Sequence, residues 1–505
     1  MAPKQCPFEQ MKGVFSSTFY LSLFFFISVL LLLKLTRKNK SKTNLNQPPS
    51  PPKLPIIGNL HQLGTLPHRS LRNLALKYGG MMMLQLGQRQ TPTLVVSSAE
   101  VAMEITKNHD IAFSNRPHNT AVKILLYGGK DVGFEVYGED WRQKRKICVV
   151  QFLSMKMVQS FGFIREEEVA ELVRKLREAS CSDAPYVNLS EMILSTSLNI
   201  IYKCLFGRQY SGDSDGRVKK AVKNIMIQIT AFSVRDYFPL LGFVDDLTGK
   251  IGEFKATFEA LDAVFDKAIE EHLTAKAHSQ KETFLNILLQ LQGHTTLTRN
   301  DVKALIMDMF IGATETTAVA LEWSISELVR NPRIMKKAQE EVREVVGHKA
   351  KVEGKDMSGM QYLKCVIKET LRLHPPAPLL AVRETISSVK LNGYDIPAKT
   401  MVYINAWAIQ RDPKFWENPE EFLPERFESS KVDFKGQDFE FIPFGIGRRG
   451  CPGINFGLAS VEYLLANLLY WFDWKLPNTE PLDMSEIFGL VASRKTPLNL
   501  KPMIY

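Results

Sequence analysis

The chain has 505 residues, of which 45% are hydrophobic and 23% are charged. These fractions are close to those of globular proteins, so they exclude a disordered, collagen-like or disulfide-framework protein. The net charge is +10, but residues 1–53 alone hold eight basic residues against one acidic residue. The rest of the chain is nearly neutral, which argues against a nucleic-acid partner. Six scattered cysteines without a Cys-x-x-Cys pair predict no zinc site.

An apolar segment over residues 14–33 is the first predicted element. Its twenty residues carry no charge and, as a helix, would extend about 30 Å, enough to cross the hydrocarbon of a bilayer. Five basic residues and no acidic residue occupy 34–42, which places the following chain in the cytoplasm by the positive-inside rule. We therefore predict an uncleaved anchor within 1–33. The alternative is a cleaved signal peptide, whose apolar core would be shorter.

A basic and proline-rich hinge is predicted over 34–55, because prolines fix φ and favour an extended spacer. No second linker divides 56–505, so we predict one large domain that is mainly α with a small β portion. Helical periodicity is clearest around 169–176 and 254–265. The predicted strands are Met82–Leu86, Thr93–Val96, Val389–Leu391 and Met401–Ile404.

One predicted helix is unusually long. Asn300 or Asp301 would cap it and Asn331, before a proline, would end it. Its middle, 312–317, reads Gly-Ala-Thr-Glu-Thr-Thr, and glycine and threonine are poor helix formers whose hydroxyl groups compete for backbone carbonyls. An acid beside an alcohol in a weakened helix indicates a functional site, and a tolerated kink is the alternative.

The strongest local signal is the loop 444–453, which has four glycines, two arginines and Cys451. Glycines permit a tight loop, and backbone N–H groups, arginines and a following helix N-terminus would favour a thiolate, a good ligand for iron. Three alternatives compete with this interpretation. Gly445-x-Gly447-x-x-Gly450 matches a dinucleotide fingerprint with Asp473 further on, but Pro443 interrupts the strand that this motif needs. The others are a buried structural cysteine and a Cys–His nucleophile.

These residues resemble the haem-binding loop of cytochrome P450 monooxygenases. The family pattern Phe-x-x-Gly-x-Arg-x-Cys-x-Gly falls on Phe444, Gly447, Arg449, Cys451 and Gly453. Further family motifs follow the expected order, and they are Trp141-x-x-x-Arg145, Glu315-Thr316, Glu369-x-x-Arg372 and Pro424–Phe427 with Arg426. The sequences of three further segments resemble those of a microsomal plant A-type member, and these segments are Pro51–Leu63, Asn405–Asp412 and Phe422–Phe427. One departure is Gly312-Ala313, where the family usually has Ala-Gly.

The resemblance implies roles for these residues. Cys451 would be the axial ligand of haem b iron, with Phe444 in the same loop, and thiolate donation would favour cleavage of the oxygen bond. Glu315 and Thr316 would deliver protons. Arginine suits carboxylates, so haem propionates would be held by Trp141, Arg145, Arg383 and Arg449. Glu369, Arg372 and Arg426 would form a buried structural lock, although most pairs of this spacing lie on solvated surfaces.

The predicted function is therefore an NADPH- and oxygen-dependent monooxygenase that oxidises a hydrophobic plant secondary metabolite. Electrons would come from a separate NADPH–cytochrome P450 reductase, and the chain would be a single-pass protein of the endoplasmic reticulum membrane with a cytoplasmic catalytic domain. The alternatives are a haem-thiolate isomerase or dehydratase, for example acting on aldoximes, and, remotely, a dinucleotide-dependent dehydrogenase.

Two surfaces follow from the same interpretation. The substrate pocket would be lined from 117–134, Val302–Ala313, Ala377–Val382 and Phe488–Val491, which are mostly apolar. A basic patch for reductase docking would comprise Arg142, Lys144, Lys146 and Arg448, with a solvated basic face as the alternative.

Overall fold

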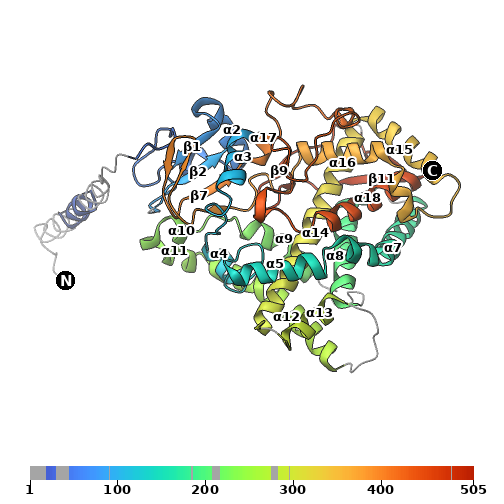
Figure 1. The fold of residues 1–505 in the computed structure, drawn as a ribbon, viewed down its shortest axis with the longest axis horizontal. Helices are drawn as coiled ribbons and strands as arrows, with labels where there is room; N and C mark the ends of the chain where they lie inside the picture. Colours follow the sequence, from blue (N-terminus) through green and yellow to red (C-terminus); the bar gives the residue numbers. More distant parts are fainter. Residues whose placement is uncertain are drawn as a thin grey trace, which may run out of the picture.

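The computed structural model describes residues 19–29, 45–89, 91–182, 186–207, 216–274, 283–294, 296–478 and 480–505. Over these residues the fold is mainly helical with four small β-sheets (Figure 1). The predicted fold class, mainly α with a small β portion, is confirmed.

The helices begin before the body with Phe19–Val29. The α-helices of the body are α2 (Pro67–Tyr78), α3 (Ala99–Asn108), α4 (Thr120–Leu125), α5 (Glu139–Gln151), α6 (Met155–Ser160), α7 (Gly162–Ser180), α8 (Leu189–Phe206), α9 (Arg217–Gln228), α10 (Val234–Tyr237), α11 (Phe243–Leu247), α12 (Lys250–Thr274), α13 (Phe284–Gln292), α14 (Arg299–Arg330), α15 (Pro332–Val346), α16 (Gln361–Leu373), α17 (Ala406–Ile409) and α18 (Ile454–Trp471). Short 3₁₀ helices are η1 (Leu60–Gln62), η2 (Pro239–Leu241), η3 (Gly354–Ser358), η4 (Pro424–Phe427) and η5 (Gly447–Arg449).

The strands form a four-stranded sheet and three smaller ones. They are β1 (Met81–Leu84), β2 (Thr93–Val96), β3 (Val187–Asn188), β4 (Arg383–Glu384), β5 (Val389–Leu391), β6 (Tyr394–Ile396), β7 (Met401–Ile404), β8 (Phe472–Lys475), β9 (Glu486–Ile487), β10 (Ser493–Arg494) and β11 (Asn499–Ile504). The largest sheet has the order β1-β2-β7-β4, with β2 and β7 parallel and the other pairs antiparallel. All four predicted strands lie at or within one or two residues of observed strands.

The long helix α14 runs through the middle of the body and packs against α8, α18, α16 and α9 (Figure 1). It begins two residues earlier than predicted, because Thr298 rather than Asn300 or Asp301 is the N-cap. The Thr298 hydroxyl accepts from the Asp301 N–H, and the Asp301 carboxylate accepts in return from the Thr298 N–H, which makes a capping box. Asn331 ends the helix as predicted.

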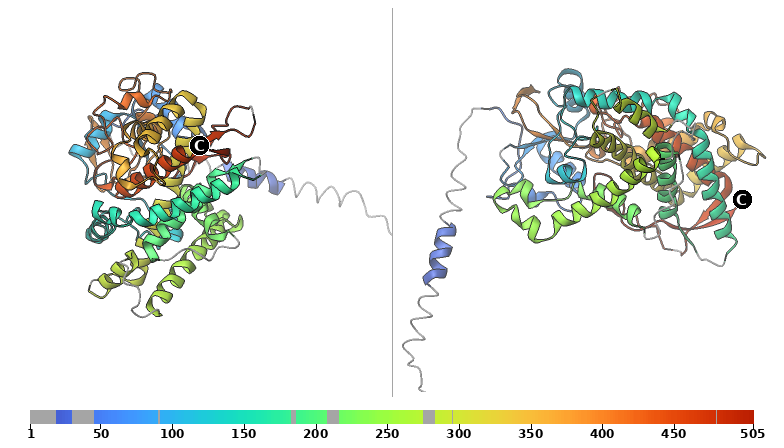
Figure 2. Two further views of the ribbon diagram at one scale, coloured as in Figure 1. Left: turned by 90° about the vertical axis from the view of Figure 1, so that its right-hand side faces the viewer. Right: turned by 90° about the horizontal axis from the view of Figure 1, so that it is seen from below.

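Two ends of the body can be distinguished in Figures 1 and 2. β1, β2 and β7 lie with α2 and α3 at one end, whereas α7, α15 and β11 lie at the other. The segment that carries Cys451 precedes α18, and α18 packs against α14. The cysteine loop and the central helix therefore meet between the two ends.

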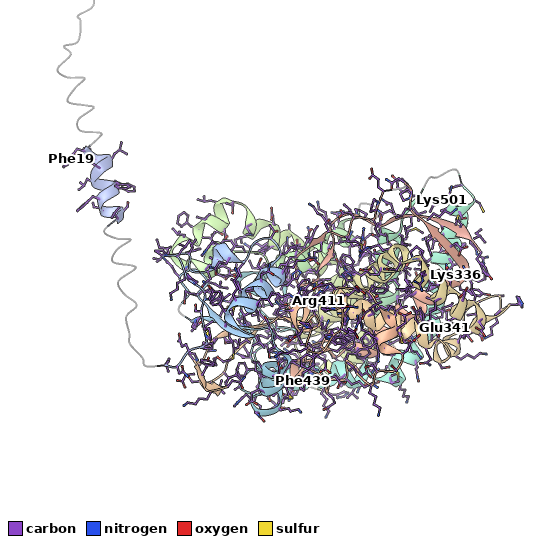
Figure 3. The ribbon with its side chains drawn as sticks, turned by 90° about the horizontal axis from the view of Figure 1, so that it is seen from above. Phe19, Lys336, Glu341, Arg411, Phe439 and Lys501 are labelled. Atoms are coloured by element: carbon purple, nitrogen blue, oxygen red, sulfur yellow. The ribbon has the colours of Figure 1, made fainter. Side chains whose placement is uncertain are left out.

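The predicted anchor lies only partly within the described residues. Residues 19–29 of the predicted 14–33 form a helix whose side chains project outward, as around Phe19 in Figure 3; Phe24 and Phe25 are both exposed. The basic part of the predicted hinge, 34–44, lies outside the described residues. Over the described chain, α14 is the one helix long and apolar enough to cross a bilayer, and it is mostly buried inside the body.

Candidate active site

The loop that carries Cys451 is held by its own backbone. The Cys451 N–H donates to the Phe444 carbonyl (2.8 Å), and the Gly450 N–H donates to the Gly447 carbonyl (2.9 Å). Gly445 and Gly447 have φ of 74° and 62°, a conformation that L side chains rarely adopt. A Cβ on Gly447 would also lie 2.5 Å from Asp110 Oδ1. Glycine at these positions is therefore required by the turn itself.

The Cys451 side chain lines a cavity and is exposed there. Burial raises its pKa, although the Gly453 N–H, 3.3 Å from Sγ, and the charge of Arg145 act in the opposite direction. The Gly453 N–H and Arg145 thus favour the thiolate, as the sequence analysis expected, whereas burial opposes it. A bound metal cation deprotonates a coordinating thiol outright.

Four arginines converge on the cavity that Cys451 faces, and they are Arg116, Arg145, Arg383 and Arg449. Burial, reinforced by the charges of Arg383 and Arg145, lowers the pKa of Arg449 to about 9. Burial also lowers the pKa of Arg383 to about 10, and its nearest carboxylate, Asp110, is 3.9 Å from Nη1. Desolvated cations placed this close together favour an anionic ligand between them.

Backbone carbonyls fix the direction of these arginines. Arg449 donates to the carbonyls of Ser114 (2.7 Å) and Glu135 (2.6 Å), and Arg145 donates to the carbonyl of Gly450 (2.7 Å). Arg383 Nη2 donates to the Ile446 carbonyl (2.5 Å), whereas Arg383 Nη1 has no hydrogen-bond partner among the described residues. The cluster thus retains one buried donor that a ligand could satisfy.

Trp141 and Phe444 lie in different places. Trp141 does not line the cavity, because its indole N–H donates to the Val132 carbonyl (3.0 Å) and its ring lies 4.1 Å from the guanidinium of Arg449. It supports the arginines from behind by a cation–π contact. Phe444 lines the cavity and stacks edge-on with Phe434.

The wall opposite the cysteine loop comes from the weakened middle of α14. Gly312, Ala313 and Thr316 line the cavity. The Thr316 hydroxyl donates to the Gly312 carbonyl (2.5 Å), and the helix remains α-helical throughout, so the predicted competition for carbonyls occurs without opening the helix. A Cβ on Gly312 would meet no atom within 4 Å, so the exchanged small residues leave room on this wall.

Glu315 faces away from the cavity and is buried. Burial raises its pKa to about 7, while the charge of Lys223 on α9 lowers it. Its Oε2 has no hydrogen-bond partner among the described residues. The predicted acid and alcohol are therefore neighbours in sequence but face different surroundings.

The three residues of the predicted lock, Glu369, Arg372 and Arg426, contact one another in the structure. Both Glu369 oxygens accept from Arg372 (2.7 and 2.8 Å), Glu369 Oε1 also accepts from Arg426 (3.0 Å), and Glu369 and Arg372 are wholly buried. Arg372 donates further to the carbonyl of Gln410, whose side-chain oxygen accepts from the Ile442 N–H. This chain of contacts leads from α16 to the residues just before the cysteine loop.

Two cavities meet at Leu380. The cavity that Cys451 lines has a volume of about 310 Å³. The other cavity lies towards the β-rich end and has a volume of about 610 Å³. Parts of the predicted lining line them, within 117–134, 308–313, 377–382 and 488–490. Val302 to Met307 line neither cavity, because this stretch of α14 is buried against other helices. The prediction missed lining residues in 57–71, 84–95 and 229–238.

Arg116 was also missed by the sequence analysis. Its Nε donates to the Gly133 carbonyl (2.9 Å) and Nη1 to the Val382 carbonyl (2.7 Å), and burial lowers its pKa. An arginine in an irregular loop outside any family motif gives no signal of burial before the fold is known.

The predicted docking patch is smaller than expected. Lys144 is buried, and its Nζ lies 2.9 Å from both Glu135 and Asp301, so it joins α5 to the start of α14. Arg448 pairs with Asp110 (2.8 Å), and Arg142 pairs with exposed Glu139 (2.6 Å). Of the four predicted residues, Arg142 and Lys146 remain exposed on α5.

The chemistry of the cavity fits haem. No group of three or more His, Cys, Asp or Glu side chains that could hold a metal ion occurs in the described part of the chain, so Cys451 would need a cofactor that supplies the other ligands. The buried arginines and the partnerless Arg383 Nη1 suit two carboxylates at the rim of such a cofactor. The site thus defines a haem-thiolate protein.

Comparison with known proteins leads to the same class. The family model "Cytochrome P450" matches residues 48–502, and the chain belongs to this family. It is therefore a haem-containing monooxygenase, and its relatives make it a plant A-type member. The predicted family, enzyme class and haem cofactor are confirmed. The dehydrogenase alternative lacks its motif, because no strand precedes Gly445 in the fully described stretch 411–450.

The relatives are plant enzymes that match nearly the whole chain. The phenylacetaldehyde oxime monooxygenase CYP71AN24 of Prunus mume is 51% identical over 95% of this chain and 94% of its own. Cytochrome P450 71A1 of Persea americana is 52% identical over 88% and 90%. Strychnine-11-hydroxylase of Strychnos nux-vomica is 45% identical over 97% and 98%. A zebrafish cytochrome P450 solved with progesterone superimposes with a TM-score of 0.75 at 25% identity, over 87% of this chain and 99% of that one.

Proposed function

We propose that the chain is a membrane-anchored, reductase-dependent monooxygenase of a hydrophobic plant metabolite, with Cys451 as the axial ligand of haem b iron. The observation that carries this proposal is the meeting of one thiol and four arginines, three of them buried, at one cavity. When bound, thiolate-ligated haem supplies the activation of oxygen. The propionates would be held by Arg116, Arg145, Arg383 and Arg449, with Trp141 behind them.

Proton delivery would use α14. Thr316 lies at the cavity and donates its hydroxyl proton to the Gly312 carbonyl, so its oxygen is placed to accept a hydrogen bond from a protonated reacting oxygen or from water. Glu315, with a pKa of about 7, exchanges protons readily at neutral pH, which suits a relay from the Lys223 side of the helix. The positions of Thr316 and Glu315 favour oxygen chemistry over the isomerase or dehydratase alternative, because those reactions need no proton relay.

The substrate would enter through the larger cavity. Its lining is mostly apolar, with polar exceptions that include His61, Arg89, Asn119 and Asp236, and its volume suits a small hydrophobic molecule. An aldoxime is the first class to test, because a relative that is 51% identical over 95% of this chain is named as an oxime monooxygenase.

Membrane attachment is supported at one end of the body. Leu240, Phe243 and Leu247, around η2 and α11, are all more than half exposed. The entry of the chain into the body lies nearby, because the Gly87 N–H donates to the Ile57 carbonyl (3.1 Å) and the Gln88 N–H to the Tyr237 carbonyl (2.8 Å). We propose that the anchor within 1–33 and this apolar end both contact the endoplasmic reticulum membrane, with 34–55 as hinge and 56–505 as the cytoplasmic catalytic domain.

The test uses microsomes that contain the full chain and a plant NADPH–cytochrome P450 reductase. Phenylacetaldehyde oxime and a panel of terpenoids, alkaloids and phenylpropanoids are incubated with NADPH under isotopically heavy oxygen gas. The proposal expects a product that forms only with NADPH. One heavy oxygen atom should be found in this product, and the other should leave as water. Product formed equally without NADPH and oxygen would instead favour the isomerase or dehydratase reading.

A further inference from the structure

Two acidic side chains meet beside the haem cavity and take no part in the machinery proposed above. Asp131 is buried in the loop between α4 and α5, and Asp308 is on α14, one turn before Gly312, where it lines the cavity. The two carboxyl groups meet at Gly133, where a Cβ would lie 3.0 Å from Asp131 Oδ2 and 3.4 Å from Asp308 Oδ1, and Asp131 Oδ1 has no other hydrogen-bond partner among the described residues. Two carboxylates in contact repel, so such a contact requires a proton between them.

The pair holds consecutive backbone N–H groups of the loop. The Val132 N–H donates to Asp308 Oδ2 (2.5 Å), and the Phe134 N–H donates to Asp131 Oδ2 (3.1 Å). The Gly133 N–H also lies beside Asp308 and lowers its pKa. A three-residue stretch is thus tied through its donors to one helix and one loop aspartate.

The carbonyl groups of the same stretch face the arginine cluster. The Val132 carbonyl accepts from Trp141 (3.0 Å) and Arg449 (3.3 Å), and the Gly133 carbonyl accepts from Arg116 (2.9 Å). The stretch therefore lies between the acid pair and the side chains that aim at the cofactor.

We propose that Asp131 and Asp308 share one proton and thereby fasten residues 131–135 to α14, which positions Arg116, Arg449 and Trp141 at the haem cavity. Asp308 carries the proton, and Asp131 is the carboxylate that faces the arginines. Both are positioning residues, since they act through the loop. The inference depends on the proposed propionate role of these arginines only for its effect on haem.

The surroundings explain this assignment. Asp131 faces the charges of Arg116 and Arg449, whereas Asp308 faces Asp131 and Cys148; Glu135 lies near Asp131 as a second acid. Burial raises the pKa of Asp131 to about 6, and burial and the charge of Asp131 raise that of Asp308 well above its ordinary value. At neutral pH the pair therefore keeps one proton.

The pH dependence has a definite sign. Both folded pKa values exceed the unfolded value of about 3.9, so the folded state binds more protons than the unfolded state. The contribution of the pair to stability is lost as pH rises, first through about 6 and then through the pKa of Asp308. Removal of the last proton leaves two carboxylates in contact and releases the loop.

The experiment compares Asp308→Asn with Asp131→Asn in the full-length holoenzyme. An amide at 308 reproduces the neutral partner, because its NH₂ donates to Asp131 and its oxygen accepts from the Val132 N–H. An amide at 131 removes the carboxylate that faces the arginines. Asp140→Asn, an exposed acid on α5, is the matched control for loss of one negative charge.

Two readouts are followed from neutral to alkaline pH, namely transfer of haem to apomyoglobin and amide hydrogen exchange of 131–136. At neutral pH the rate of haem transfer from Asp308→Asn should be within about twofold of the wild-type rate. This rate should rise less steeply with pH than that of the wild type. Asp131→Asn should lose haem roughly 10- to 100-fold faster and exchange faster in this segment. Asp140→Asn should follow the wild type.

Equal haem loss and exchange in the two asparagine variants would overturn the shared-proton pair. An unchanged pH dependence in Asp308→Asn would do the same. If Asp131→Asn does not accumulate, the pH profile of Asp308→Asn against the wild type decides alone. Hydrogen exchange reports on the loop itself, so if the arginines do not hold the cofactor, exchange would still differ between the two variants while haem transfer would not.

Discussion

At the scale of single residues, two threonines of α14 can be compared. The hydroxyl of Thr316 has a proposed function, whereas that of Thr314 is structural. Both donate to the carbonyl four residues earlier, but Thr316 lines the cavity and Thr314 is wholly buried away from it. Their contributions to the helix are therefore alike, and only one hydroxyl can reach a reacting oxygen.

Thr316→Ala should retain haem but divert NADPH electrons from product to peroxide, because oxygen is no longer protonated correctly. The loss of coupled turnover is expected on the order of 10²–10⁴. Product, NADPH and peroxide are measured together. Thr314→Ala, the matched control, should stay coupled, and tight coupling in both variants would refute the role of Thr316.

Glu315 gives the site a pH dependence. Its raised folded pKa means that its contribution to stability is present at low pH and is lost as pH rises through about 7. Glu315→Gln should therefore lower the coupled rate and flatten its pH profile near 7. Above about pH 7 the free energy of unfolding of the variant should exceed that of the wild type, by on the order of 1–3 kcal/mol. A turnover profile that keeps its shape would exclude Glu315 from the relay.

At the scale of elements, the lock between α16 and η4 supports the cysteine loop from outside the cavity. Glu369→Ala would leave the wholly buried Arg372 without its carboxylate, a loss of about 3–5 kcal/mol. We expect little haem-loaded protein in microsomes, measured as haem per antibody-detected chain. Glu340→Ala, which removes an exposed acid on α15, serves as comparison. Normal haem loading of Glu369→Ala would show that the lock is dispensable.

Local patterns explain which elements the sequence could predict. The strands, the end of α14, the cysteine loop and the residues of the lock each depend on neighbouring residues or a short motif. The N-cap at Thr298 was missed because the capping box works through the Thr298 and Asp301 side chains together. Arg116 and the pair of Asp131 and Asp308 were missed because their chemistry arises only where distant segments meet. Lys144 was misplaced because a lysine between charged neighbours on a helix ordinarily faces solvent.

At the scale of the whole molecule, the surface of α5 is the proposed site for the reductase. Reversal of Arg142 and Lys146 to Glu should slow the first electron transfer while haem stays bound, and the loss should shrink as salt rises, since screening acts over about 8 Å. Stopped-flow reduction across a salt series measures this. Reversal of Lys336 and Lys501 to Glu, at two exposed lysines on α15 and β11, makes the same charge change elsewhere and should have little effect (Figure 3). Equal rates for all variants at low salt would place docking on another face.

The central claim is that Cys451 ligates haem iron through a thiolate, and the carbon monoxide difference spectrum of reduced microsomes tests it most directly. The full chain should show the thiolate-type Soret band. Cys451→Ala should lose that band together with turnover, whereas Cys148→Ala, Cys204→Ala and Cys365→Ala, which alter other buried cysteines, should keep it. A thiolate-type band that persists in Cys451→Ala, or that disappears in one of the other three haem-loaded variants, would contradict the assignment.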